Sequence, residues 1–202
     1  MSYYTISYNY DFKKNVIALD MDGTIIIPKS GRKFPKNKDD WKFIFNSNTR
    51  LKDLSKNNSI VIITNQLGIS KNKTTIEDIT HKIDSIVQEL DISVMAMIAS
   101  EDNNYRKPRI GFYQMLEQKY IDNESQINSF AYIGDAAGRP KDHSDSDYKF
   151  LLNVAKYNPQ INTIFKTPED FFLDQSNSNI TVGGYQLDYK GKDSTKKIIK
   201  KI

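Results

Sequence analysis

Cysteine is absent from this chain of 202 residues. Its absence excludes disulfides, thiolate zinc sites and iron–sulfur clusters. Residues 1–5 have neither a basic start nor an apolar stretch, so no secretory signal is expected. No apolar run approaches the roughly 18 residues that a membrane-spanning helix needs. Together these absences predict an intracellular protein, nuclear or cytoplasmic, that is not secreted and has no membrane partner.

Histidine is scarce, and nucleotide-binding loops are missing. Of the two histidines, His81 lies off the apolar stripe of its expected helix and His143 lies in a polar loop, so neither belongs to a recognisable catalytic pattern. No Gly-x-x-x-x-Gly-Lys-Ser/Thr sequence occurs, and a kinase domain is therefore not expected. No internal repeat and no Pro- or Gly-rich linker divides the chain. We expect residues 1–202 to form a single domain.

Short apolar runs recur along the chain and are typical of strands that are buried on both faces. They span residues 16–19, 60–63, 94–99 and 130–133. Amphipathic segments separate them. Alternation of strands and helices implies right-handed crossovers and a mostly parallel sheet with helices on both faces. The sequence thus predicts a three-layer, Rossmann-like α/β fold.

The clearest amphipathic segment follows the second apolar run. Its start is predicted from Thr74, with Glu77 three residues later, in the pattern of a capping box. Its apolar residues recur at helical spacing and form one stripe. They are Ile76, Ile79, Ile83, Ile86, Val87 and Leu90. A second helix is expected to begin at Pro108, because proline is acceptable in the first turn.

A long stretch with little periodicity, residues 24–45, follows the first apolar run. It contains Pro28, Gly31 and Pro35 and exceeds an ordinary connection. Loops of this length are usually lids or binding loops, so we expect a small flap over the carboxyl edge of the sheet, where ligands of such folds bind. Several of the basic residues behind the net charge of +4 crowd this flap. They are Lys29, Arg32, Lys33, Lys36 and Lys38.

Two carboxylates separated by one residue follow the first buried run. Asp20 and Asp22 lead into a turn that contains Gly23. A calcium-binding EF-hand loop starting at Asp20 would need Gly at its sixth position and Glu at its twelfth. The chain has Ile25 and Gly31 there, so the calcium interpretation fails. The pattern instead suits Mg²⁺-assisted phosphoryl transfer through an aspartyl-phosphate.

Each residue of this motif can be given a role. Asp20 is the expected nucleophile, because a carboxylate can attack phosphorus and form a covalent intermediate. Asp22 is expected to protonate the leaving oxygen and then to deprotonate the attacking water. Gly23 lets the backbone turn away, so that amide groups of Met21, Gly23 and Thr24 can bind the phosphate.

Polar groups also follow the other predicted strands. Thr64, at the end of the second run, is either a structural cap or, with the backbone amide of Asn65, a ligand of a phosphoryl oxygen. Lys107 precedes Pro108 and is a candidate to balance the charge of the phosphate and the nucleophile. Both are counted with Asp20 and Asp22 among the candidate catalytic residues.

The last polar group, Asp135, follows the fourth run and Gly134. Mg²⁺ prefers one or two carboxylates together with waters and phosphate oxygens. The carboxylates of Asp20 and Asp135 and the carbonyl of Asp22 meet that description. We therefore predict a Mg²⁺ site formed by these three residues, with the ion neutralising charge on the transferred phosphoryl group.

Together these elements resemble the four motifs of the haloacid dehalogenase-like phosphatases. The sequence between them is similar, over nearly its whole length, to a narrower family, the phosphatase domain of polynucleotide kinase 3′-phosphatase. The string Gly-Asp-Ala-Ala-Gly-Arg at 134–139 is more discriminating than Asp-x-Asp-Gly-Thr. The matching stretches are 19–24, 30–35, 63–69, 105–108, 133–140 and 167–173.

This resemblance implies Mg²⁺-dependent removal of a 3′-phosphate from DNA ends, with DNA as the partner and a monomer as the simplest state. It implies a role for Arg106 and Arg139, because guanidinium groups beside the pocket could hold backbone phosphates. A structural ion pair is the alternative for both. Asp147 matches the second acidic position of the fourth motif and is expected to hold Lys107 or a metal-bound water.

Two aromatic residues of the flap have alternative roles. Trp41 and Phe34 either stack on a base or pack the flap.

A small-molecule phosphatase acting on a sugar phosphate or mononucleotide is the principal alternative function, and a non-enzymatic scaffold for broken DNA ends is another. The basic flap argues against the first, and the complete set of polar groups argues against the second.

Overall fold

The computed structural model describes residues 2–173. In chain order its elements are β1 (Tyr3–Tyr8), β2 (Asn15–Leu19), β3 (Ile26–Ile27), β4 (Lys42–Phe43), α1 (Ser47–Ser55), β5 (Ser59–Asn65), α2 (Ile76–Leu90), β6 (Val94–Ala99), α3 (Gly111–Asp122), β7 (Ser129–Ile133), α4 (Ser146–Tyr157), β8 (Asn162–Lys166) and α5 (Pro168–Phe172). In the part of the chain described here, no helix combines the length and apolar character needed to cross a membrane.

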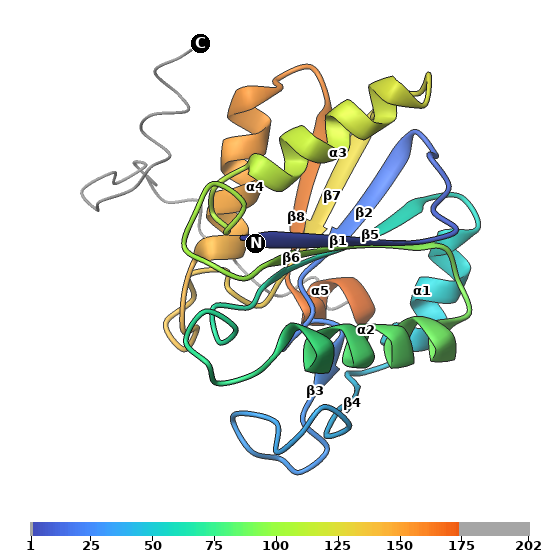
Figure 1. Ribbon diagram of the computed structural model, residues 1–202. Coiled ribbons are helices and arrows are strands. Elements are labelled where there is room, and N and C mark those ends of the chain that lie inside the picture. The colour runs from blue at the N-terminus through green and yellow to red at the C-terminus, as the bar shows by residue number, and fades with distance from the viewer. Residues whose placement is uncertain (1, 174–202) are drawn as a thin grey trace.

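The main sheet has six strands in the order β1-β6-β5-β2-β7-β8 (Figure 1). β1 runs antiparallel to β6, and the other neighbours are parallel. Helices α1, α2 and α5 cover one face, and α3 and α4 cover the other (Figure 1). The mostly parallel three-layer α/β fold that the sequence predicts is confirmed.

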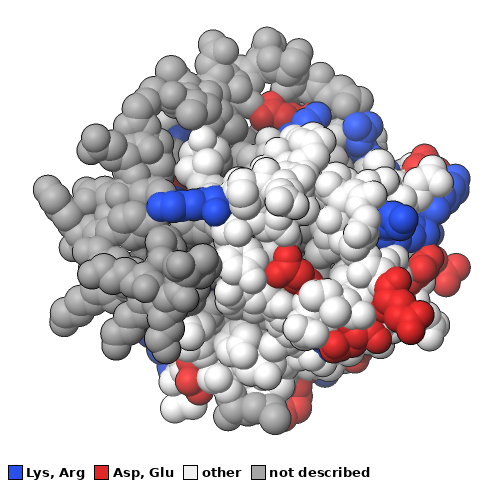
Figure 2. Space-filling model, turned by 90° about the horizontal axis from the view of Figure 1, so that it is seen from above, with Lys and Arg blue, Asp and Glu red and all other residues white. Residues whose placement is uncertain are grey.

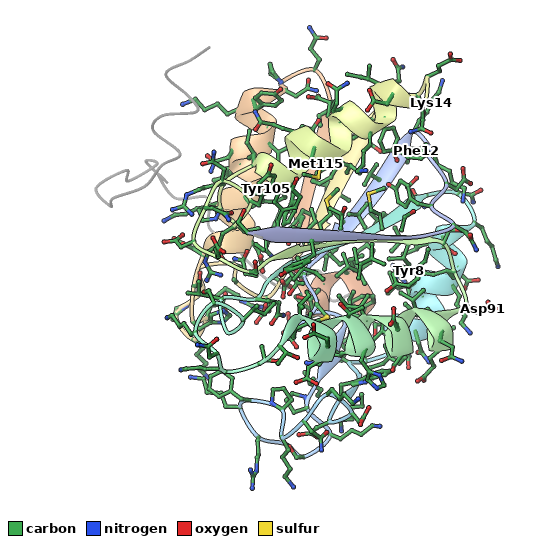
Figure 3. The ribbon with its side chains drawn as sticks, viewed as in Figure 1. Tyr8, Phe12, Lys14, Asp91, Tyr105 and Met115 are labelled. Carbon is green, nitrogen blue, oxygen red and sulfur yellow. The ribbon has the colours of Figure 1, made fainter. Side chains whose placement is uncertain are left out.

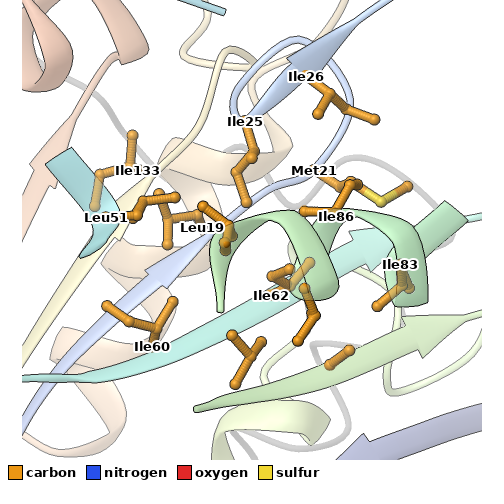
Figure 4. Packing of buried hydrophobic residues seen from close by; sticks show 14 of the residues in the cluster. Leu19, Met21, Ile25, Ile26, Leu51, Ile60, Ile62, Ile83, Ile86 and Ile133 are labelled. Atoms are coloured by element: carbon orange, nitrogen blue, oxygen red, sulfur yellow. The ribbon is translucent and has the colours of Figure 1, made fainter. Parts of the chain in front are cut away.

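Each face of the sheet has its own apolar core. One core joins residues such as Leu19 and Ile62 of the sheet to α2 through Ile83 and Ile86, as Figure 4 shows. The other joins alternate strand residues to α3 and α4 through aromatic side chains such as Phe112 and Phe150. Because successive strand residues serve opposite cores, the central strands are apolar throughout, which is why their sequences read as continuous runs.

The two edge strands were not predicted. β1 and β8 alternate between half-buried and exposed positions instead of being buried throughout. A strand at the edge of the sheet needs apolar residues on only one of its two faces. Neither β1 nor β8 therefore appears in the sequence as a continuous apolar run. Two helix starts also differ from prediction: α2 is capped by Thr75, which accepts a bond from the Asp78 amide at 3.1 Å, and α3 begins at Gly111 rather than Pro108.

The flap lies between β2 and α1 and extends beyond the sheet (Figure 1). The two-stranded ribbon of β3 and β4 forms its base. Asp40 holds the loop above it: its carboxylate accepts bonds from the Ser30 amide and hydroxyl at 2.8 and 2.6 Å and from the Lys36 amide at 2.8 Å. These bonds, with the Ser30 hydroxyl first, lower the pKa of Asp40 to about 2. The flap is thus an ordered loop.

The aromatic residues of the flap have different surroundings. Trp41 is 7% exposed and lies edge-on against Phe43 in the apolar core. Phe34 is 72% exposed. Of these two residues, Trp41 therefore packs the flap and Phe34 remains accessible.

Candidate active site

The carboxyl ends of the parallel strands bring the predicted residues to one edge of the sheet. Asp20 follows β2, Thr64 is near the end of β5, and Asp135 follows β7. The loop after β6 supplies Lys107. In Figure 3, Tyr105 marks this loop, while Lys14, just before β2, marks the opposite edge.

A buried ammonium group forms the centre of the site. Lys107 Nζ lies 2.7 Å from Asp20 Oδ1 and 2.7 Å from Asp147 Oδ1, and it donates to the Tyr132 hydroxyl at 2.6 Å. An ammonium has three donors, so each has an acceptor. Lys107 is 3% exposed. The Asn65 side chain fixes the backbone of Lys107, accepting from its amide at 3.0 Å and donating to its carbonyl at 3.1 Å.

The site has more negative than positive charge. Asp20, Asp135 and Asp147 each place one ligand atom within 4.8 Å of the others. Burial raises the pKa of Asp20 well above its ordinary value even though Lys107 opposes the shift. Burial, followed by the charge of Asp147, raises the pKa of Asp135 to about 6. One ammonium does not balance three carboxylates, and an all-oxygen cluster of this kind fits a divalent cation such as Mg²⁺.

The carboxylates around Lys107 favour its charged form. Burial alone acts to lower its pKa, but the carboxylates of Asp147 and Asp20 outweigh burial and raise it. The lysine is therefore charged at neutral pH. In this structure Asp147 contacts Lys107, one of the two roles expected for it, and it also belongs to the acidic cluster.

Two glycines allow the carboxylates to approach the backbone. Gly23 has φ of +83°, and a Cβ atom there would lie 2.6 Å from Asp135 Oδ2. A Cβ at Gly134 would lie 2.3 Å from Asp147 Oδ2. Real Cβ atoms do not approach so closely, so any side chain at either position would displace a carboxylate of the cluster.

Asp22 lies at the border of the cluster, with its side chain 49% exposed. Gln66 Nε2 donates to its Oδ2 at 2.8 Å and also to Thr64 Oγ1 at 2.8 Å. Lys82 Nζ, from α2, lies 3.8 Å from its Oδ1. The carboxylate of Asp22 does not belong to the acidic cluster. That its carbonyl binds a metal stays a prediction.

The side chains of Thr24 and Met21, also in the first motif, support the structure around the site. Thr24 is fully buried and its hydroxyl accepts a bond from the Asp135 amide at 3.1 Å. The Met21 side chain is also fully buried and points into the core beside α2 (Figure 4). For both residues only the backbone is left for binding a phosphate.

The two predicted phosphate-binding arginines differ. Arg139 donates to Asp142 from Nε at 2.9 Å, to Glu169 from Nη1 at 3.1 Å and to the Asp135 carbonyl from Nη2 at 3.2 Å. This arrangement matches the structural ion pair that was the alternative. Arg106 is half-buried, and its Nη1 has no hydrogen-bond partner among residues 2–173.

Three residues of the site were given no role from the sequence. Tyr132 could have been noticed, because it places a hydroxyl in the otherwise apolar run 130–133. Lys82 could have been noticed too, because it lies on the same helical stripe as Ile79 and Ile86 and interrupts it. Gln66 lies in a matched stretch, but the bonds it makes depend on where the loop after β5 and the first motif meet.

Comparison with known proteins assigns the family. The family described as Polynucleotide kinase 3 phosphatase matches residues 15–172. The bifunctional polynucleotide phosphatase/kinase of Schizosaccharomyces pombe is 38% identical over 165 residues, which cover 81% of this chain and 38% of that protein. The polynucleotide 3′-phosphatase of Saccharomyces cerevisiae is 30% identical over 214 residues, 78% of this chain and 87% of that protein. The chain thus spans well under half of the first relative.

A solved structure has the same fold. The D,D-heptose bisphosphate phosphatase of B. bronchiseptica, complexed with magnesium and phosphate, superposes with a TM-score of 0.59 at 16% identity, over 94% of this chain and 99% of that one. Likeness at this identity extends to the fold alone and agrees with the three-layer α/β architecture described above. With a family match that covers most of its length, the chain belongs to the polynucleotide kinase 3 phosphatase family.

Proposed function

We propose that this protein removes the 3′-phosphate from DNA ends in a Mg²⁺-dependent reaction through an aspartyl-phosphate. The observation that carries the proposal is the buried cluster of Asp20, Asp135 and Asp147 around Lys107, in a chain of this family. Such a cluster provides a nucleophile, a cation site and a fixed positive charge at one point.

In the first half of the reaction a carboxylate oxygen of Asp20 forms a bond to phosphorus while the bond from phosphorus to the 3′-oxygen breaks. Asp22 gives its proton to that oxygen, which leaves as a 3′-hydroxyl. Lys107, held at 2.7 Å from Asp20, keeps the nucleophile in place and offsets its charge as the phosphoryl group approaches.

In the second half a water molecule attacks phosphorus of the aspartyl-phosphate. Asp22, now ionised, takes a proton from this water, and the bond between phosphorus and the Asp20 oxygen breaks. Inorganic phosphate and the free Asp20 carboxylate result. One residue thus acts first as acid and then as base, which requires its side chain to face the same side of phosphorus in both halves.

Asp20, Asp135 and Asp147 are the carboxylates that would hold Mg²⁺, with the Asp22 carbonyl. When bound, the ion would neutralise charge that builds up on the phosphoryl oxygens. The excess of carboxylates over ammonium groups in the cluster supports this assignment.

Mg²⁺ is expected to raise the melting temperature strongly at about pH 7.5 and only weakly at about pH 5. The pKa of Asp135 is about 6, above its ordinary value, so this carboxyl is ionised at the higher pH and mostly protonated at the lower. Protons and the cation then compete for one site. At about 100 times its Kd, Mg²⁺ would add about 2.7 kcal/mol of stability. Thermal unfolding with and without Mg²⁺ measures the difference.

The variant Asp135→Asn is the control for this measurement and should show little Mg²⁺ stabilisation at either pH. An equal rise of the melting temperature at both pH values in the unaltered protein would contradict the assignment of Asp135.

The flap side of the molecule is the proposed DNA surface. Its most exposed aromatic residue, Phe34, could contact a base, and Arg106, which is half-buried beside Lys107, could contact a backbone phosphate. The face over α3 and α4, in contrast, has few charged residues near its centre (Figure 2). The flap also carries the charges suited to a polyanion, namely Lys29, Arg32, Lys33, Lys36 and Lys38. DNA of the nucleus or cytoplasm is the proposed partner. Because every group named for the reaction comes from one chain, a monomer suffices for activity.

A side-by-side assay tests the function. A 3′-phosphorylated oligonucleotide is expected to have a kcat/KM at least about tenfold above that of a 5′-phosphorylated oligonucleotide or a mononucleotide. Its KM should rise steeply with salt, because phosphate contacts release counterions. p-Nitrophenyl phosphate, which has no backbone phosphates, serves as the control and should show little salt dependence.

A higher kcat/KM for mononucleotides would favour the small-molecule phosphatase instead. Salt-independent turnover of the oligonucleotide would count against the flap as a DNA surface.

A further inference from the structure

One buried charge outside the acidic cluster is not explained by the proposed reaction. Lys82 lies on the apolar stripe of α2, three residues after Ile79 and four before Ile86, and it is 4% exposed. Lysine is almost never fully buried unless it is paired, because removing an ammonium from water costs several kcal/mol. An apolar residue at this position would pack as its neighbours do. The lysine therefore serves something other than the core.

The negative charge that Lys82 faces belongs to Asp22. Lys82 Nζ lies 3.8 Å from Asp22 Oδ1, and the Gln66 amide donates to the other oxygen, Oδ2, at 2.8 Å. The two oxygens of the carboxylate are thus approached by two different elements, α2 and the loop after β5. Without them the half-exposed side chain of Asp22 would be free to change rotamer.

The flap meets α2 at the neighbouring position. His81 Nε2 lies 3.0 Å from Asp39 Oδ1 of the flap. The side chain of Lys82, the next residue, lies instead near Asp22. Adjacent residues of α2 thus contact the flap and the first motif.

We propose that Lys82 is a positioning residue that keeps the Asp22 carboxylate directed at the leaving oxygen. The proposal rests on the proposed function, in which Asp22 is the acid that protonates this oxygen. Gln66 cooperates from the other side of the carboxylate. Lys82 acts through Asp22 and has no contact of its own with the reacting atoms.

The test compares two leaving groups in a single turnover. The sugar 3′-oxygen of an oligonucleotide needs a proton to leave, whereas the nitrophenolate of p-nitrophenyl phosphate does not. For Lys82→Met, which keeps the length of the side chain without the charge, we expect the rate for the oligonucleotide to fall about 10–100-fold, since a positioned acid contributes roughly 10²–10⁴. Nitrophenolate release should stay within about threefold, and the concentration that gives half of the maximal single-turnover rate should change little.

Several variants keep this test decisive. Lys82→Arg retains the charge and should restore most of the oligonucleotide rate. Lys56→Met, at an exposed lysine that pairs only with Asp53 among residues 2–173, controls for loss of charge in general. The double variant Asp22→Asn, Lys82→Met should be no slower than Asp22→Asn alone, because Lys82 acts through that residue. If Lys82→Met does not fold, Lys82→Gln takes its place.

Equal losses with both substrates would overturn the proposal, and so would additive losses in the double variant. Failure of the DNA function has a different signature. If the unaltered protein hydrolyses glycerol phosphate but not the oligonucleotide, the DNA substrate is wrong. The role of Lys82 is then tested with glycerol phosphate in place of the oligonucleotide, again against p-nitrophenyl phosphate.

Discussion

Replacement of Asp20 by asparagine is expected to reduce turnover of a 3′-phosphorylated oligonucleotide by more than about a thousandfold. The amide keeps the shape of the side chain but cannot attack phosphorus, so no aspartyl-phosphate forms. Phosphate release and trapping of the acid-stable or reduced aspartyl-phosphate on the protein are the measurements.

The fold should survive this change. Burial raises the pKa of Asp20, which means that its ionised form is unfavourable in the absence of a cation. A neutral amide oxygen can still accept a bond from Lys107, so the melting temperature should not fall. Asp53→Asn, at an exposed carboxylate of α1, is the control. Normal turnover by Asp20→Asn would show that the covalent mechanism is wrong.

Lys107→Met is expected to remove both activity and stability. Loss of one partner from a buried charge pair costs about 3–5 kcal/mol because the other partner stays buried without compensation. For a protein of this size that corresponds to a decrease of roughly 6–20 °C in the melting temperature. Asp20 and Asp147 would face each other without the ammonium that now lies 2.7 Å from each. Thermal and denaturant unfolding at neutral pH measure the loss.

The difference in stability between Lys107→Met and the unaltered protein should become smaller at acidic pH. The charge of Lys107 acts to lower the pKa values of Asp20 and Asp135. Without it both pKa values rise further, so the folded variant takes up protons at a higher pH than the unaltered protein does. Stability of the variant relative to the unaltered protein therefore recovers between about pH 7.5 and pH 5. The exposed Lys56→Met substitution should be neutral at both pH values. A deficit that does not change with pH would mean that Lys107 stabilises the fold by packing alone.

Much of the site could be predicted because its residues follow central strands. Asp20, Thr64 and Asp135 come directly after or at the end of runs that are apolar on both faces, and the carboxyl ends of parallel strands meet at one edge. Lys107 is in a loop after β6 and was found from its surroundings in the sequence. The local pattern was sufficient wherever the topology of the sheet alone sets the position of a residue.

The remainder depends on contacts between elements that are distant in sequence. Whether Lys82 faces Asp22 is decided by the packing angle of α2, and periodicity gives only the face of a helix. Arg139 pairs with Asp142, three residues later, but also with Glu169, thirty residues later, and this second pair could not be predicted from the local sequence. β1 and β8 were missed for a related reason, since an edge strand is defined by the neighbour on its one paired side.

The first strand also governs how the molecule behaves toward copies of itself. β1 precedes the stretch matched by the family, which starts at residue 15, yet it covers β6 along its full length. The Tyr8 hydroxyl additionally donates to Asp84 of α2. A recombinant fragment trimmed to the family boundary would leave the backbone donors and acceptors of β6 open beside apolar side chains, a template for intermolecular pairing. The six residues of β1 thus protect the edge of β6 from intermolecular pairing.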